Sequence, residues 1–189
     1  MMRFVLFLCA SLFLAGCASH SGDDLQPKTA SNVNLKRYQG TWYELARLPM
    51  YFQRNCAQSE ARYTVLPDGD MSVFNRCLTS EWKWQEAKGT ATPQVPGMTV
   101  KLWVEFNNWF TSPWPGVAMC DYWVLYVSDD YKTAIVVSPS RRYMWILSRT
   151  PTVSADTRED LLSRARQQGY DTTRLIWRTS DKQMAKTSQ

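Results

Sequence analysis

Between residues 42 and 149 the sequence is a succession of short strand patterns separated by turn signals, with no helical pattern among them. Residues 98–106 give the clearest pattern, because apolar residues beginning with Met98 and Val100 alternate there with mostly polar ones. The run Pro-Asp-Gly-Asp at residues 67–70 is a strong hairpin signal. We predict strands at residues 42–48, 57–66, 71–78, 82–92, 98–106, 120–128, 132–138 and 143–149.

These eight strands follow one another as a meander, and an even meander removes its exposed edges by closing into a barrel. The sequence therefore predicts an all-β fold, an eight-stranded antiparallel up-and-down β-barrel. Eight strands leave an interior just wide enough for one small ligand. If Asp68 and Gly69 form a two-residue turn, Tyr63 and Phe74 face each other across the hairpin, with Arg76 on the same face.

The pattern changes after the eighth strand. Ser154 can cap a helix that ends at Gly169, with acidic residues in the first turns and an apolar stripe that includes Leu161. A brief strand pattern follows at residues 174–178. We therefore predict one folded domain over residues 34–180 with a C-terminal α-helix and a short ninth strand, and a disordered tail over residues 181–189.

The N-terminus has the features of a targeting segment. A short charged start precedes an apolar run that is too short to span a bilayer, and the run ends in Leu-Ala-Gly before Cys17. This arrangement resembles the bacterial lipobox, in which the cysteine is acylated and becomes the first residue of the mature protein. We expect a lipoprotein signal peptide at residues 1–16, an acylated (palmitate-bearing) Cys17, and a flexible polar tether over residues 17–33. By the same resemblance, Ala18 favours sorting to the outer membrane, with the protein facing the periplasm.

Charge and histidine content exclude several functions. The formal net charge is +5, but the basic residues do not form a stripe, so we expect no nucleic-acid partner. His20 is the only histidine and lies in the expected tether. A histidine-ligated haem, a zinc hydrolase site and a Ser-His-Asp triad each need a histidine in the folded part. We therefore expect neither a metal nor a cofactor.

Three cysteines, Cys56, Cys77 and Cys120, lie in the predicted domain. In an oxidising compartment they allow three pairings. Simple hairpin register places Cys77 opposite Glu60, so a bond between Cys56 and Cys77 requires a bulge or a loop turn.

Three motifs occur in order along the domain. They are Gly40-x-Trp42 in the first strand, Ser-Asp-Asp-Tyr-Lys-Thr-Ala at residues 128–134, and Trp-Ile-Leu-Ser-Arg-Thr-Pro at residues 145–151. In these motifs, and over residues 34–178, the chain resembles the lipocalin family, most closely the bacterial outer-membrane lipocalins related to apolipoprotein D. The resemblance implies that Trp42 packs under Arg149 at the closed end of the barrel, a structural role. It also favours a Cys56–Cys77 disulfide, which leaves Cys120 unpaired.

The inward direction implied by Trp42 and Arg149 selects Tyr143 and Trp145 as candidate ligand-binding residues, and the hairpin and the patterns of the fifth and sixth strands supply the other candidates. Together the candidates are Tyr63, Phe74, Arg76, Val100, Leu102, Tyr122, Val124, Tyr126, Tyr143 and Trp145. Apolar walls with phenol groups suit an acyl chain with a polar head, and Arg76 is suited to a carboxylate or phosphate. We expect the loop that carries Trp109, Phe110 and Trp114 at the mouth of the barrel, in contact with membrane.

We therefore expect a membrane-anchored lipid-binding protein, not an enzyme, that holds a fatty acid or a lysophospholipid for storage, transport or repair in the envelope. A homodimer is compatible with this function. Two alternatives stay open. One is a thiol-dependent lipid-modifying enzyme that uses Cys120, because one lipocalin branch is a thiol-using isomerase. The other is a structural envelope lipoprotein with a packed core. A Cys120→Ser variant discriminates the first alternative, because it keeps binding but loses thiol chemistry.

Overall fold

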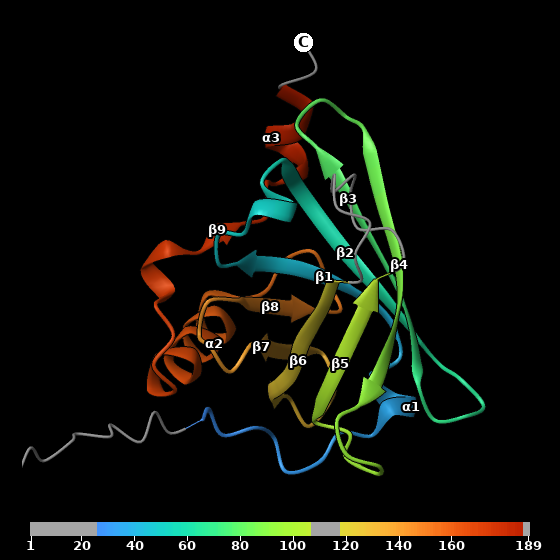
Figure 1. Cartoon of the computed structure of the whole chain (residues 1–189). Coiled ribbons are helices and arrows are strands. Elements are labelled where there is room, and N and C mark those ends of the chain that lie inside the picture. Colours follow the sequence, from blue (N-terminus) through green and yellow to red (C-terminus); the bar gives the residue numbers. More distant parts are fainter. Residues whose placement is uncertain (1–25, 107–117, 187–189) are drawn as a thin grey trace, which may run out of the picture.

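The computed structural model describes residues 26–106 and 118–186. Its centre is a closed antiparallel barrel of eight strands (Figure 1). Consecutive strands pair, and β1 closes the ring by pairing with both β2 and β8. The strands are β1 (Gly40–Arg47), β2 (Cys56–Val65), β3 (Met71–Thr79), β4 (Trp84–Pro93), β5 (Lys101–Phe106), β6 (Ala118–Val127), β7 (Thr133–Val137) and β8 (Met144–Ser148). The predicted barrel is confirmed, with strand ends that shift by a few residues.

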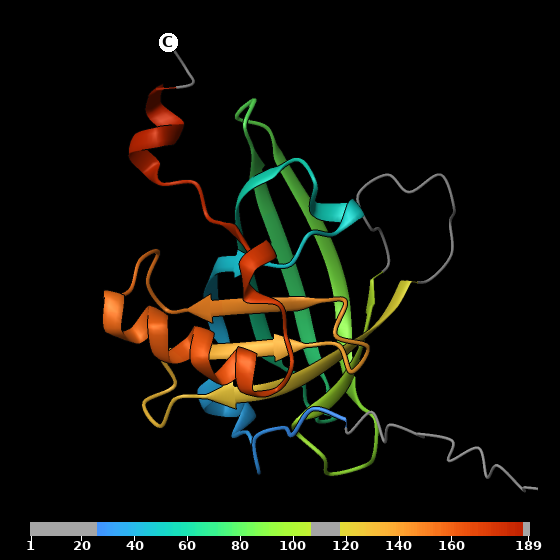
Figure 2. The same ribbon diagram turned by 90° about the vertical axis from the view of Figure 1, so that its left-hand side faces the viewer.

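The predicted C-terminal helix is present, and it packs on the outside of the barrel. This helix, α2 (Ala155–Gln167), begins after Ser154, whose Oγ accepts a hydrogen bond from the Thr157 N–H at 3.2 Å. Its buried Leu161 and Ala165 join a second apolar core on the outer face of β7 and β8 (Figure 2). The short strand β9 (Ile176–Trp177) pairs with the end of β1. None of the helices in the described ranges is long and apolar enough to cross a membrane.

The hairpin between β2 and β3 differs from the predicted register by one residue. Leu66 N–H donates to the Asp70 carbonyl at 2.8 Å, so the loop has three residues, and Gly69 takes a positive φ of 94°. Tyr63 therefore pairs with Val73, and Phe74 pairs with Arg62. Because side chains alternate along a strand, the one-residue shift turns Phe74 to the outer face.

Two bulges change the alternation elsewhere. The register of β1 against β8 shifts between Glu44 and Ala46, which turns both Glu44 and Arg47 to the interior. The register of β6 against β7 shifts between Val124 and Tyr126. Tyr126 consequently lies on the outer face, where the Arg164 guanidinium of α2 stacks over its ring at 4.1 Å.

One end of the barrel is closed by the helix α1 (Leu35–Tyr38) and by Arg149. The guanidinium of Arg149 lies 3.9 Å from the centre of the Trp42 ring. It also donates hydrogen bonds of 2.8–3.0 Å to the carbonyls of Arg37, Tyr38, Gln39 and Thr41. Trp42 Nε1 donates to the Tyr38 carbonyl at 2.7 Å, so one cation holds the start of β1 to the end of β8.

The two ends of the described chain are more ordered than the sequence suggests. Residues 26–33, assigned to a flexible tether, lie along the barrel, with Val33 buried and the Ala30 N–H bonded to the Val124 carbonyl at 2.9 Å. The assignment of a disordered tail also fails for α3 (Asp181–Lys186). Burial of Met184 and a hydrogen bond of 2.8 Å from Gln58 Nε2 to Asp181 stabilise this helix. The expected signal peptide and Cys17 lie outside the described residues.

Candidate functional site

The interior of the barrel has two parts. The part next to α1 is filled by core side chains, among them Tyr38, Trp42 and Leu102. The other part contains a cavity, in which the space that no atom fills, together with the solvent at its opening, amounts to about 740 Å³. Most of its wall is apolar or aromatic, and the aliphatic and phenyl side chains include Ala61, Val73, Val104, Phe106, Val136 and Leu147.

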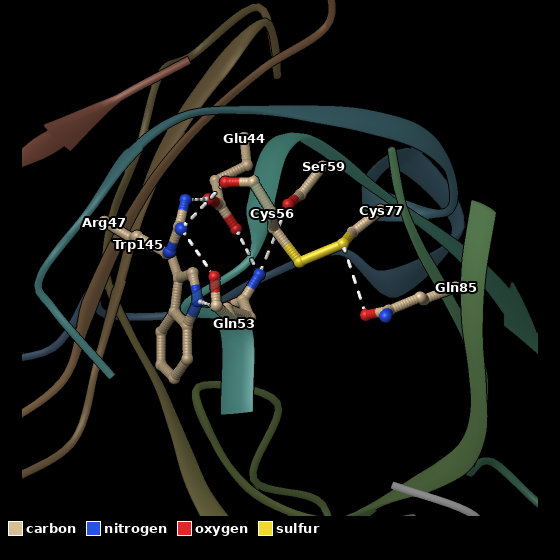
Figure 3. Close-up of polar contacts among 8 residues, drawn as sticks. All are labelled: Glu44, Arg47, Gln53, Cys56, Ser59, Cys77, Gln85 and Trp145. Atoms are coloured by element: carbon tan, nitrogen blue, oxygen red, sulfur yellow. Dashed lines mark hydrogen bonds and ion pairs between the residues drawn. A yellow bond between two sulfur atoms is a disulfide. The ribbon is translucent and has the colours of Figure 1, made fainter. Parts of the chain in front are cut away.

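A buried polar network lies beside this cavity, where β1 leads into the short helix η1 (Tyr51–Gln53) (Figure 3). Arg47 Nη1 donates to Glu44 Oε1 at 2.9 Å, and Arg47 Nη2 donates to the carbonyls of Gln53 and Cys56 at 2.7 and 3.0 Å. The Gln53 amide donates to Glu44 Oε2 at 2.9 Å and accepts from Trp145 Nε1 at 3.0 Å. The network balances the buried Glu44 charge and fixes η1 to the barrel.

Three tyrosine hydroxyls form the inner limit of the cavity. Tyr122 OH lies 2.9 Å from both Tyr38 OH and Tyr63 OH. Burial raises the pKa of all three phenols, that of Tyr63 to about 12. The hydroxyls are therefore protonated near neutral pH and act as hydrogen-bond donors.

The cysteines are arranged as the resemblance implied. Cys56 and Cys77 form a disulfide, and the required bulge lies between Cys56 and Gln58. Among the cysteines that the structure describes, Cys120 is the free one, and it lines the cavity. Burial and the neighbouring carboxylate of Asp121 raise the pKa of its thiol. A nucleophilic cysteine requires the opposite shift.

The ten candidate ligand-binding residues fall into three groups. Tyr63, Tyr122 and Trp145 line the cavity. Four others belong to the interior away from it: Val100, Leu102 and Val124 are buried in the filled core, and Tyr143 stacks between Phe52 and Trp145.

The structure corrects the prediction for the remaining three candidates. The shifted hairpin register and the β6 bulge give their side chains other directions than predicted. Phe74 and Tyr126 lie on the outer face. Arg76 contributes to the wall, but its guanidinium forms an ion pair with Glu60 and stacks on Trp84, with 42% of the side chain exposed. Its guanidinium is therefore engaged by Glu60 and Trp84 and partly exposed to solvent, instead of being buried inside the barrel. The loop with Trp109, Phe110 and Trp114 lies outside the described residues.

Sequence reasoning missed six polar residues of the described cavity wall: Glu44, Gln53, Ser59, Glu60, Asn75 and Asp121. Glu44 has the parity of Trp42 and was available to the alternation argument. Asn75 turns inward only with a three-residue hairpin loop, for which Gly69 was the available signal. The residues of the described ranges contain no cluster of three or more histidine, cysteine or acidic side chains that could hold a metal.

Comparison with known proteins gives consistent matches. A family model described as a lipocalin-like domain matches residues 33–180. Outer membrane lipoprotein Blc of Escherichia coli (strain K12) is 34% identical over 148 residues, which are 78% of this chain and 79% of that protein. Temperature-induced lipocalin-1 of Arabidopsis thaliana is 38% identical over 152 residues, 78% and 80% of the two chains. Apolipoprotein D of Rattus norvegicus is 30% identical over 167 residues, 82% of each.

Solved structures show the same fold at lower sequence identity. Insecticyanin from the tobacco hornworm Manduca sexta superposes with a TM-score of 0.64 at 19% identity, over 84% of this chain and 86% of that one. Lobster apocrustacyanin A1 superposes with a TM-score of 0.59 at 16% identity, over 76% and 78% of the two chains. At such identities the likeness concerns the fold alone.

Proposed function

The chain belongs to the lipocalin family, whose members bind lipids and other small hydrophobic molecules, and we propose that this protein holds one acyl lipid, a fatty acid or a lysophospholipid, in its barrel. The observation that carries the proposal is the cavity, which has a largely apolar wall and a polar network beside it. An acyl chain suits the apolar wall, and the atom-free space that continues to the mouth provides its length.

The energetics are sufficient for such a ligand. Burying a chain of about fifteen methylenes contributes roughly 0.8 kcal/mol each, or about 12 kcal/mol in all. An association cost of about 4 kcal/mol or more leaves binding near the micromolar range. Because an apolar wall selects length and shape only weakly, the polar groups of the cavity must discriminate between head groups.

We further propose that the protein is an outer-membrane lipoprotein. Its support is the N-terminal sequence that ends in Cys17 and the similarity to the outer membrane lipoproteins Blc. In this proposal residues 1–16 are a signal peptide, Cys17 carries the acyl anchor, and the barrel faces the periplasm. The bound lipid is then stored, transported or returned for repair within the envelope. Homodimers are compatible with this role.

We propose no catalytic role for Cys120. Burial and Asp121 raise the pKa of its thiol, whereas thiol catalysis needs a base or a positive neighbour that lowers the pKa.

Lipid extraction from the purified full-length protein tests the proposed function. Solvent extraction removes non-covalent lipid, and mass spectrometry then identifies it separately from the covalent anchor. We expect close to one acyl lipid per protein, and saturable one-to-one binding of a fluorescent fatty-acid analogue that quenches tryptophan emission. A protein that yields no lipid and shows no saturable binding would have a packed barrel, and the structural alternative would replace this proposal.

A further inference from the structure

Asn75 lines the cavity and has an amide oxygen that no group of the described residues satisfies. It lies on β3, where its neighbours across the ladder are Ala61 on β2 and Ala87 on β4. These small side chains leave room beside Asn75. Its Oδ1 is buried and has no hydrogen-bond partner among the described residues. A buried amide oxygen without a partner is destabilising, so a ligand group that donates a hydrogen bond to it gains binding free energy.

Tyr63 supplies a second unused hydrogen-bonding group at the same wall. Tyr122 OH donates to Tyr63 OH, which leaves Tyr38 as the donor to Tyr122. The hydroxyl hydrogens of Tyr38 and Tyr122 form the two hydrogen bonds, so the hydroxyl hydrogen of Tyr63 remains unused. Tyr63 is only 4% exposed to solvent, and it lines the cavity. A ligand oxygen beside it accepts this hydrogen.

The charges around the cavity disfavour an anionic head. Glu44 lines the wall, and both of its carboxylate oxygens face donors of Arg47 and Gln53. Arg47 lies behind Glu44, where its Nη atoms are occupied by that carboxylate and by two carbonyls. Arg76 is paired with Glu60. The single cation of the described wall, Arg76, is thus already paired with a carboxylate, and Glu44, Glu60 and Asp121 add negative charge to the same wall, so burying a further anion there is costly.

We propose that Asn75 and Tyr63 form a polar subsite that binds an uncharged, hydroxyl-bearing part of an acyl lipid, such as the glycerol unit of a lysophospholipid, in preference to the free carboxylate of a fatty acid. A hydroxyl both donates and accepts, so it satisfies the Asn75 oxygen and the Tyr63 hydrogen, whereas a carboxylate donates nothing. The space of about 740 Å³ in and at the opening of the cavity accommodates such a unit together with its acyl chain. This inference rests on the proposed function and narrows its ligand class.

The test compares two probes that share one acyl chain, monolauroylglycerol and laurate. The purified full-length protein is stripped of lipid and titrated with each by calorimetry near neutral pH. We expect monolauroylglycerol to bind about tenfold more tightly, which corresponds to one satisfied buried hydrogen-bonding group. Laurate that binds equally or more tightly overturns the inference and leaves the proposed function intact. If neither probe binds, both fail.

A matched pair of variants assigns the preference to the subsite. Asn75→Ala weakens monolauroylglycerol binding by about fivefold to tenfold and leaves laurate binding within about twofold. Ser72→Ala on the outer face of the same strand changes neither affinity. Equal weakening of both probes by Asn75→Ala would mean a structural role for Asn75 and would overturn the assignment. The comparison of probes on the unaltered protein does not depend on the variant folding.

Discussion

At the scale of single residues, the buried phenols couple the fold to alkaline pH. The ordinary pKa of tyrosine is 10.0, and burial raises that of Tyr63 to about 12 and that of Tyr38 further. The folded pKa is above the unfolded one. The stabilisation is therefore complete below about pH 10 and is lost as the pH rises from 10 towards 12.

We therefore expect alkaline unfolding that starts above pH 10 and is partly abolished by Tyr63→Phe. Urea unfolding at several pH values should show a loss of stability between pH 10 and 12 that is about 2 kcal/mol smaller in the variant. Phenolate absorbance recorded in parallel separates ionisation of folded protein from ionisation that follows unfolding. An identical alkaline loss in both proteins would show that Tyr63 does not contribute.

At the scale of elements, the β2–β3 hairpin is the unit on which the site depends. Its loop sets which face of β3 turns inward, and the Cys56–Cys77 disulfide ties its open end over 21 residues of sequence. Cross-linking a loop of this length stabilises a protein chiefly by restricting the unfolded chain.

The double variant Cys56→Ser, Cys77→Ser should lose about 3 kcal/mol of unfolding free energy. Cys120→Ser serves as the control, because Cys120 forms no disulfide, and it should stay within about 0.5 kcal/mol of the parent. Chemical denaturation measures the unfolding free energy of both variants, and denaturation of the parent with and without reductant tests the disulfide directly. Reductant that leaves the parent's midpoint unchanged would contradict the expectation.

The elements themselves were predictable because strand alternation, turn residues and the Ser154 cap are local signals. The direction in which individual side chains point was less predictable. One extra residue in the loop at Gly69 exchanges Phe74 for Asn75, and the bulge after Val124 removes Tyr126 from the interior. A shift of one residue reverses every side chain beyond it, and the free-energy differences that select a three-residue loop or a bulge come from tertiary packing.

At the scale of the whole molecule, Arg149 joins the first and last strands of the barrel. It contacts Trp42 and the carbonyls of four residues around α1, at the end away from the cavity. Arg149 therefore contributes to the closure of the barrel and not to ligand binding.

Arg149→Ala should cost about 3 kcal/mol of stability, because it removes several charged hydrogen bonds and a cation–π contact at once. Lipid affinity, measured well below the unfolding transition, should stay within about twofold. Arg62→Ala on the exposed face of β2 is the matched control, with an effect within about 0.5 kcal/mol. If the Arg149→Ala variant kept its stability but lost lipid binding, Arg149 would act in ligand binding and not in barrel closure.

The closure of the ring also orders events during biogenesis. Tyr43 pairs with Ser148, so β1 cannot be enclosed until β8, about a hundred residues later, is in place. Until then the intermediate hairpins can form only an open sheet, whose two unpaired edges are prone to associate with other chains. The interval in which the folding chain is vulnerable to association therefore ends only when its final barrel strand pairs.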